Sequence, residues 1–206
     1  MQAPKSQSQF PLLPRRTPVR YRRPMTTRIT IAAVCLAFCA TAPAWAAPEL
    51  KPGDAAPLFT AKTQSGEVFD LASRKGRWTV LFFYPKAGTP GCTKQVCAFR
   101  DSVKTIRGEG AEVYGISADT VEDQAAFHQE HQLAFTLLAD PDGTVIEAYG
   151  AKMPILNMSK RWRFIIDPEL TIRQVEHDVD PAADAQRVAK EIARLKATAP
   201  NAPAAQ

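Results

Sequence analysis

The sequence predicts one α/β domain in which a mixed β-sheet is flanked by helices. Short apolar runs typical of buried strands alternate with helical segments along most of the chain. Two further strand-like runs and an amphipathic helix follow, and this order adds an antiparallel pair to the sheet. With 206 residues, the chain is long enough for one well-buried core and short for two domains of ordinary size.

The first strands of the sheet are predicted before residue 85. After an extended stretch over residues 47–57, residues 58–61 followed by Gly66 predict a short strand and a turn. Residues 78–84 form a continuous run of apolar, β-branched and aromatic side chains. Such a run is typical of a strand buried on both faces of a central sheet.

A helix is expected after that strand and a loop over residues 86–89. The hydroxyl of Thr89 would cap it, and Pro90 would take the first helical position, where proline is favoured. The helix should run to about Arg107, before Gly108. This places Cys92 in its first turn.

The rest of the chain completes the fold. Thr120 or Asp119 should cap the next helix. A strand, that helix, a strand and a short helix are expected over residues 111–117, 120–131, 135–138 and 144–149. An antiparallel hairpin, an amphipathic helix and a disordered Ala- and Pro-rich tail should then occupy residues 162–176, 181–195 and 197–206. This order is thioredoxin-like, with the domain expected over residues 47–196.

The basic residues are concentrated at the front of the chain. Residues 1–46 hold seven of the 26 Lys and Arg residues and no acidic residue. Removing these seven charges turns the net charge from +5 to −2. The basic balance therefore belongs to a leader, and the sequence gives no reason to expect a nucleic-acid partner.

Residues 25–46 have the layout of a secretory signal peptide. Arg28 precedes the apolar run 29–40, and Ala44-Trp45-Ala46 places small residues at the two positions that a signal peptidase reads. We expect cleavage after Ala46, export to the periplasm, and contact with the membrane only through this segment. A retained amphipathic anchor is the alternative. Whether translation starts at Met1 or Met25, and whether export uses the Sec or the twin-arginine route, stays open.

Cleavage would leave two cysteines, Cys92 and Cys97. In an oxidising compartment, the simplest reading of such a pair is a structural disulfide. The position of Cys92 suggests chemistry instead. Only a few per cent of an ordinary thiol is thiolate at neutral pH, and the thiolate is the nucleophile. The N–H groups and the positive dipole end of a first helical turn favour that form, and Gly91 allows close approach to the backbone.

The residues around Cys92 resemble the peroxiredoxin family. Pro85-x-x-x-Thr89-x-x-Cys92 matches the family signature. The longer run over residues 83–93, with Cys97 and Phe99-Arg100-Asp101, looks like the bacterioferritin-comigratory, or PrxQ-type, branch. The similarity extends over roughly residues 50–195.

This resemblance implies a role for each site residue. Cys92 would attack the peroxide and Cys97 would resolve the product as a Cys92–Cys97 disulfide. Thr89 would hydrogen-bond the peroxide, and Pro85 would shield the nascent sulfenic acid. Arg161, three residues before the Phe164-Ile-Ile-Asp167 run, would complete the site with a planar cationic donor.

Several neighbouring residues compete with these assignments. Arg163 lies two residues after Arg161 and so on the same face of a strand, but we expect it on a solvated basic edge. His128 and His131 share a helical face, which we interpret as a surface helix rather than a metal site. Trp162 and Phe164 are expected in the core.

The sequence thus predicts a thiol peroxidase that needs no cofactor and no metal. Its substrates would be hydrogen peroxide or small organic hydroperoxides, and a thioredoxin or thioredoxin-like protein would reduce it again. One alternative is a thiol–disulfide oxidoreductase on the same fold, although that chemistry usually uses C-x-x-C, whereas four residues separate these cysteines. The other is a non-enzymatic secreted domain with a structural disulfide.

Overall fold

A computed structural model describes residues 49–198 of the chain. The predicted leader over residues 1–46, its cleavage site and the last eight residues, 199–206, lie outside this range. Within the range, no helix is both long and apolar enough to span a membrane.

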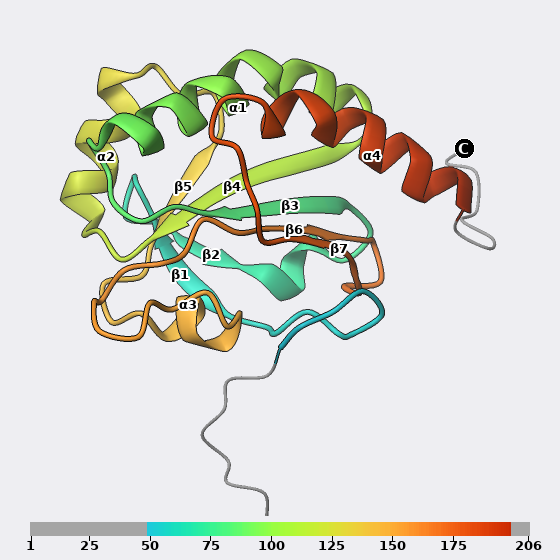
Figure 1. The fold of residues 1–206 in the computed structure, drawn as a ribbon, viewed down its shortest axis with the longest axis horizontal. Coiled ribbons are helices and arrows are strands. Elements are labelled where there is room, and N and C mark those ends of the chain that lie inside the picture. The colour runs from blue at the N-terminus through green and yellow to red at the C-terminus, as the bar shows by residue number, and fades with distance from the viewer. Residues whose placement is uncertain (1–48, 199–206) are drawn as a thin grey trace, which may run out of the picture. The chain divides into compact units, whose positions relative to one another are not determined.

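The described residues form one seven-stranded mixed sheet, in the order β2-β1-β5-β4-β3-β6-β7 (Figure 1). Strands β3, β4 and β5 at its centre are parallel, and the remaining neighbours pair antiparallel. The strands are β1 (Thr60–Thr63), β2 (Val68–Asp70), β3 (Trp78–Phe83), β4 (Ala111–Ser117), β5 (Thr136–Ala139), β6 (Arg163–Ile166) and β7 (Ile172–Glu176). The expected mixed sheet and thioredoxin-like order are confirmed.

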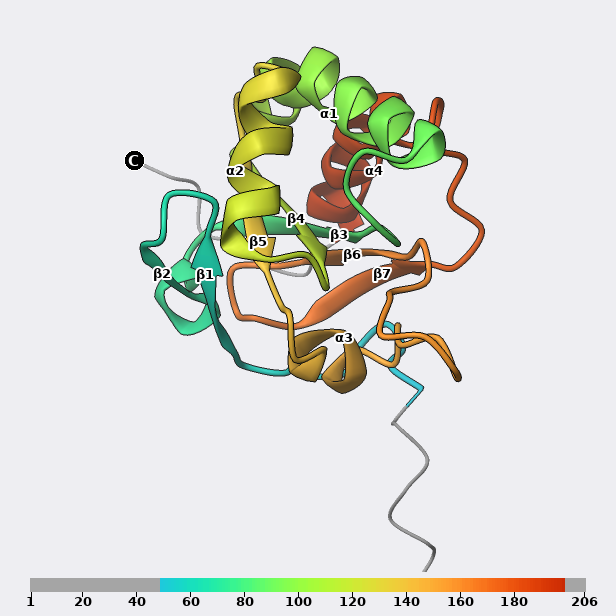
Figure 2. The same cartoon turned by 90° about the vertical axis from the view of Figure 1, so that its left-hand side faces the viewer.

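Helices cover both faces of this sheet (Figures 1 and 2). The long helices α1 (Pro90–Gly108), α2 (Val121–Glu130) and α4 (Asp184–Thr198) lie on one face. The short helix α3 (Thr144–Ala148) and the 3₁₀ turn η1 (Leu71–Arg74) lie on the other. The domain is therefore a three-layer sandwich.

Alternation along β3 divides the core into two clusters. Val80 and Phe82 pack with α1, α2 and α4, whereas Leu81 and Phe83 pack on the α3 side. All four side chains are fully buried, as the continuous apolar run predicts. Phe82 stacks on Phe99 of α1 with ring centroids 4.2 Å apart, which fixes α1 over the centre of the sheet.

Most element boundaries agree with the sequence prediction, and the differences have local causes. Strand β2 was not predicted, because three residues with an exposed Val68 give too little periodicity. Helix α4 begins at Asp184 and not at residue 181. The side chain of Asp180 accepts hydrogen bonds from the amides of Ala182 and Ala183, which holds a turn before the helix. The helix also continues through Thr198, so the expected tail does not begin at residue 197.

Candidate active site

Cys92 is the third residue of α1, which begins at the carboxyl end of the central strand β3. Its side chain is fully buried among apolar residues of the α1 layer. Both Cys92 and Cys97 are free thiols. The predicted placement of Cys92 in a first helical turn is therefore observed.

Arg161 reaches Cys92 from the segment before β6. Its Nη2 donates to Sγ of Cys92 at 3.5 Å, and its Nη1 donates to Oε1 of Gln95. A Cβ on Gly91 would lie 3.2 Å from Nη2 of Arg161, closer than most side chains tolerate. Glycine at position 91 thus admits the guanidinium to the backbone of the first turn.

Gln95 is a site residue that the sequence analysis missed. It is buried, with 1% of its surface exposed, and its carboxamide oxygen accepts the hydrogen bond from Arg161. Its Nε2 has no hydrogen-bond partner within residues 49–198. The available signal was spacing, since a residue three positions after Cys92 lies on the same side of the helix.

Thr89 takes the N-cap position but does not cap α1 with its side chain. Its hydroxyl donates to the carbonyl of Lys86 at 3.0 Å, so the expected capping hydrogen bond is wrong. Pro90 removes one of the N–H groups that a cap could satisfy. The N–H groups of the first turn are thus left without a side-chain cap and can bind a ligand beside Cys92.

Pro85 is half-buried and directly follows Tyr84 at the end of β3. It opens the loop that leads to Thr89 and α1. The strand end before it is fixed, because the hydroxyl of Ser159 donates to the carbonyl of Tyr84 at 2.7 Å.

Cys97 lies on the same uninterrupted helix as Cys92 and is half-buried against the core. Five helical positions give a rise of about 7.5 Å and a rotation of about 140°, so the two Cα atoms should be roughly 8.6 Å apart. An unstrained disulfide needs at most ~6.8 Å. The two thiols therefore cannot join while α1 is intact.

Arg163 does not lie on a solvated edge, and that prediction is wrong. Its side chain is fully buried, with Nε 2.8 Å from Oδ2 of Asp184 and Nη2 2.8 Å from Oε2 of Glu191. Both acids belong to α4. Burial raises the pKa of Asp184 and the positive charge of Arg163 opposes that rise. Arg163 thus binds β6 to α4 and does not face Cys92.

His128, His131, Trp162 and Phe164 make contacts within the fold and not with Cys92. The ring Nε2 of His128 is 3.1 Å from the carbonyl of Phe135, and His131 packs edge-on against Phe127. No group of three or more potential metal ligands occurs in the described part of the chain. Phe164 is buried as expected, but Trp162 is only half-buried and lies against His177 with centroids 3.9 Å apart.

Comparison with known proteins yields one consistent set of relatives. A sequence model described as the AhpC/TSA family matches residues 52–175. The putative peroxiredoxin bcp of Coxiella burnetii is 42% identical over 129 residues, which cover 60% of this chain and 85% of that protein. The chloroplastic peroxiredoxin Q of Populus jackii is 38% identical over 124 residues, which cover 60% of this chain but only 58% of that protein.

Solved structures agree. The crystal structure of peroxidoxin BcpB from Mycobacterium tuberculosis has a TM-score of 0.65 at 35% identity, covering 73% of this chain and 99% of that one. A structure of Xanthomonas campestris peroxiredoxin Q has a TM-score of 0.61 at 28% identity, covering 68% and 90%.

Proposed function

The chain belongs to the AhpC/TSA family, and from this premise we propose that it is a peroxidase that reduces hydrogen peroxide and organic hydroperoxides with Cys92 as nucleophile. The observation that carries this proposal is the 3.5 Å contact between Nη2 of Arg161 and Sγ of Cys92. The guanidinium places a permanent positive charge beside the sulfur that would attack the peroxide.

The groups beside Cys92 also suit the transition state of a thiolate attack on a peroxide. Attack by a thiolate on a peroxide spreads negative charge over the sulfur and both oxygens, so fixed donors beside the sulfur stabilise it. Arg161 and the N–H groups of the first turn of α1 are such donors. We assign Thr89 and Pro85 the roles that the family signature implies, namely holding the peroxide and shielding the oxidised sulfur.

The proposed reaction has three steps. The Cys92 thiolate attacks one peroxide oxygen, the O–O bond breaks, and the leaving oxygen takes up a proton as water or an alcohol. The resulting Cys92 sulfenic acid reacts with the Cys97 thiol, which forms the S–S bond and releases water. A thioredoxin-like dithiol then exchanges with this disulfide, and it supplies two electrons and two protons as it is itself oxidised.

Rapid mixing of the reduced protein with hydrogen peroxide tests the proposal against its two rivals. Fast formation of a sulfenic acid on Cys92 supports the peroxidase. Disulfide exchange without a peroxide reaction supports a thiol–disulfide oxidoreductase, and inertness supports a non-enzymatic domain. Cys92→Ser is the control, since a serine hydroxyl is a poor nucleophile at neutral pH. Substantial peroxide turnover by this variant would end the assignment of Cys92.

We further propose that the protein is exported to the periplasm, on the basis of the signal-like pattern at residues 25–46. The reductant would then be a thioredoxin-like protein of that compartment. Sequencing the N-terminus of the mature protein tests this, and a start at Ala47 is the expected result. A mature protein that retains residues 25–46 would contradict it.

A further inference from the structure

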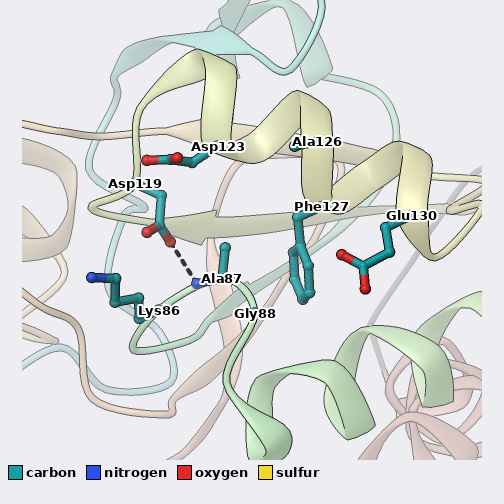
Figure 3. A pocket seen from close by; sticks show the side chains of 8 residues that line it. All are labelled: Lys86, Ala87, Gly88, Asp119, Asp123, Ala126, Phe127 and Glu130. Atoms are coloured by element: carbon teal, nitrogen blue, oxygen red, sulfur yellow. Dashed lines mark hydrogen bonds between the residues drawn. The ribbon is translucent and has the colours of Figure 1, made fainter.

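Residues 86–89, the second part of the loop between β3 and α1, are hydrogen-bonded to the rest of the domain through one carboxylate, that of Asp119. The N–H of Ala87 donates to Oδ2 of Asp119 at 2.7 Å (Figure 3). Asp119 lies between β4 and α2. Within residues 49–198, the bond from Ala87 to Asp119 is the one hydrogen bond that residues 86–89 make outside their own loop and α1. The hydroxyl of Thr89 turns back to Lys86 and adds no further attachment.

The carboxylate is itself held by a buried chain of polar groups. The hydroxyl of Ser117 donates to the same Oδ2 at 2.6 Å and accepts a hydrogen bond from Nε2 of Gln124 at 2.7 Å. Oε1 of Gln124 accepts a hydrogen bond from the hydroxyl of Tyr84. Hydrogen bonds to a carboxylate are shorter and stronger than neutral ones. Asp119 therefore presents a fixed acceptor to the loop.

This chain of hydrogen bonds starts in the core cluster that also contains Cys92. Tyr84 and Cys92 are fully buried members of the same core cluster. Burial raises the pKa of Tyr84 far above its ordinary value, so its hydroxyl keeps the proton that it donates to Gln124. The network thus holds the chain on both sides of Pro85, at Tyr84 before it and at Ala87 after it.

Side-chain packing supports the loop at Ala87, which packs against the core cluster on the α1 side. A cavity of about 280 Å³ lies between the loop and α2, where Asp119 and Phe127 form part of its wall (Figure 3). A second cavity of about 200 Å³ lies on the side of Asn157 and Met158, and Asp119 lines it too. The loop is therefore flanked by open space on two sides, and the hydrogen bond to Asp119 and the packing of Ala87 hold it in place.

We propose that Asp119 is a latch, a positioning residue that controls how often the loop of residues 85–89 and the first turns of α1 open. The latched form holds Cys92 beside Arg161. The open form exposes Cys92 and allows it to reach Cys97, which the intact helix prevents. The link between opening and disulfide formation rests on the proposed function, whereas the opening itself does not.

The test uses Asp119→Asn, which keeps the side-chain shape but removes the charge. In the reduced protein, amides of residues 87–97 should exchange about tenfold faster, because a charge-assisted hydrogen bond becomes a neutral one. In single-turnover mixing with hydrogen peroxide, disulfide formation should accelerate by a similar factor. The peroxide step should change less than twofold, because the latched form stays the majority. A merely structural role would not speed one step and spare the other.

The matched control is Asp123→Asn, since Asp123 lines the same cavities but bonds to Thr120 and not to the loop. It should leave exchange and both rates unchanged within twofold. Ser117→Ala removes the hydroxyl that donates to Asp119, so it should have the same effect as Asp119→Asn but a weaker one. It replaces Asp119→Asn in the test if that variant fails to fold.

Two results would overturn the latch. One is unchanged exchange at residues 87–97, or faster exchange that includes β3 equally. The other is faster local exchange with a disulfide step that does not accelerate. If exchange rises locally but neither the variant nor the parent protein reacts with peroxide, the peroxidase proposal fails and the latch stands.

Discussion

Nη2 of Arg161 lies 3.5 Å from Sγ of Cys92, although 69 residues separate the two in the chain. The contact joins the segment before β6 to the first turn of α1. It brings together a nucleophile and a permanent cation, the two groups that the attack of sulfur on a peroxide requires.

Removing the cation should slow the peroxide step. Arg161→Ala is expected to lower the second-order rate with hydrogen peroxide by at least about tenfold, in line with the loss of one charge-stabilising donor. Rapid mixing of the reduced protein gives this rate directly. Lys160→Ala is the control, because Lys160 lies over the ring of Trp162 instead. A larger loss in Lys160→Ala than in Arg161→Ala would refute the assignment.

Arg163→Ala would be an unsuitable control for that experiment. It removes one partner of a buried ion pair with Asp184, a change that typically costs about 3–5 kcal/mol of folding free energy. A rate loss in that variant would therefore report unfolding as well as chemistry.

Gln95 should act through Arg161. Gln95→Ala removes the acceptor that orients the guanidinium, and we expect the peroxide step to slow by about tenfold or less. The distinguishing measurement is a double-mutant cycle. In the Arg161→Ala background, Gln95→Ala should have almost no further effect on the rate. Additive effects of the two changes would mean that Gln95 contributes separately. Lys94→Ala, at the preceding exposed position, should leave the rate unchanged.

Cys97 should matter for recycling and not for the first step. Cys97→Ser is expected to form the Cys92 sulfenic acid at nearly the normal rate, because the guanidinium of Arg161 donates to Gln95 and Cys92 and not to Cys97. Steady turnover with a thioredoxin-like donor should then stop, since no intramolecular disulfide forms. Mass spectrometry of the oxidised variant and a coupled turnover assay check the two halves. Normal cycling by Cys97→Ser would exclude it as the resolving residue.

Disulfide formation should unwind the start of α1. Cys92 and Cys97 lie on one continuous helix, at roughly 8.6 Å between Cα atoms by helix geometry, too far for an unstrained disulfide. Amides of residues 92–99 should therefore lose protection from hydrogen exchange in the oxidised protein. Strand β3 should keep its protection, because it is buried on both faces. Unchanged exchange at residues 92–99, with the disulfide confirmed by mass spectrometry, would falsify this step.

Asp184 should give stability an identifiable pH dependence. Burial raises its pKa in the folded protein, partly opposed by Arg163, so the folded state binds this proton more tightly than the unfolded chain does. The contribution of Asp184 to stability is then greatest below the ordinary carboxyl pKa and is lost as pH rises through the raised one. Urea unfolding over a pH series should show the wild type losing free energy of unfolding relative to Asp184→Asn in that window.

Asp180 provides the control of opposite sign. Hydrogen bonds from the amides of Ala182 and Ala183 lower its pKa. Its contribution is therefore present above the ordinary carboxyl pKa and is lost as pH falls through the lowered one. As pH rises, the free energy of unfolding of the wild type should fall relative to Asp184→Asn and rise relative to Asp180→Asn. If both differences changed in the same direction, the assignment of Asp184 would be wrong.

The sequence by itself determined most of the elements and the place of Cys92. The apolar run that became β3 and the Thr-Pro pair at the start of α1 are local signals, because periodicity and the fixed φ of proline act within a few residues. They put a thiol in the first turn of a helix after a central strand. The family resemblance then singled out Arg161 among nearby cations.

Tertiary structure decided which partners the polar side chains meet. Alternation places Arg161 and Arg163 on one face, so periodicity cannot tell them apart, yet one reaches Cys92 and the other is buried against α4. Gln95 beside Arg161 and Asp119 beneath the β3–α1 loop likewise carry no local signature. The physical reason is that a hydrogen bond or ion pair depends on the packing of segments far apart in the chain, which local propensity does not encode.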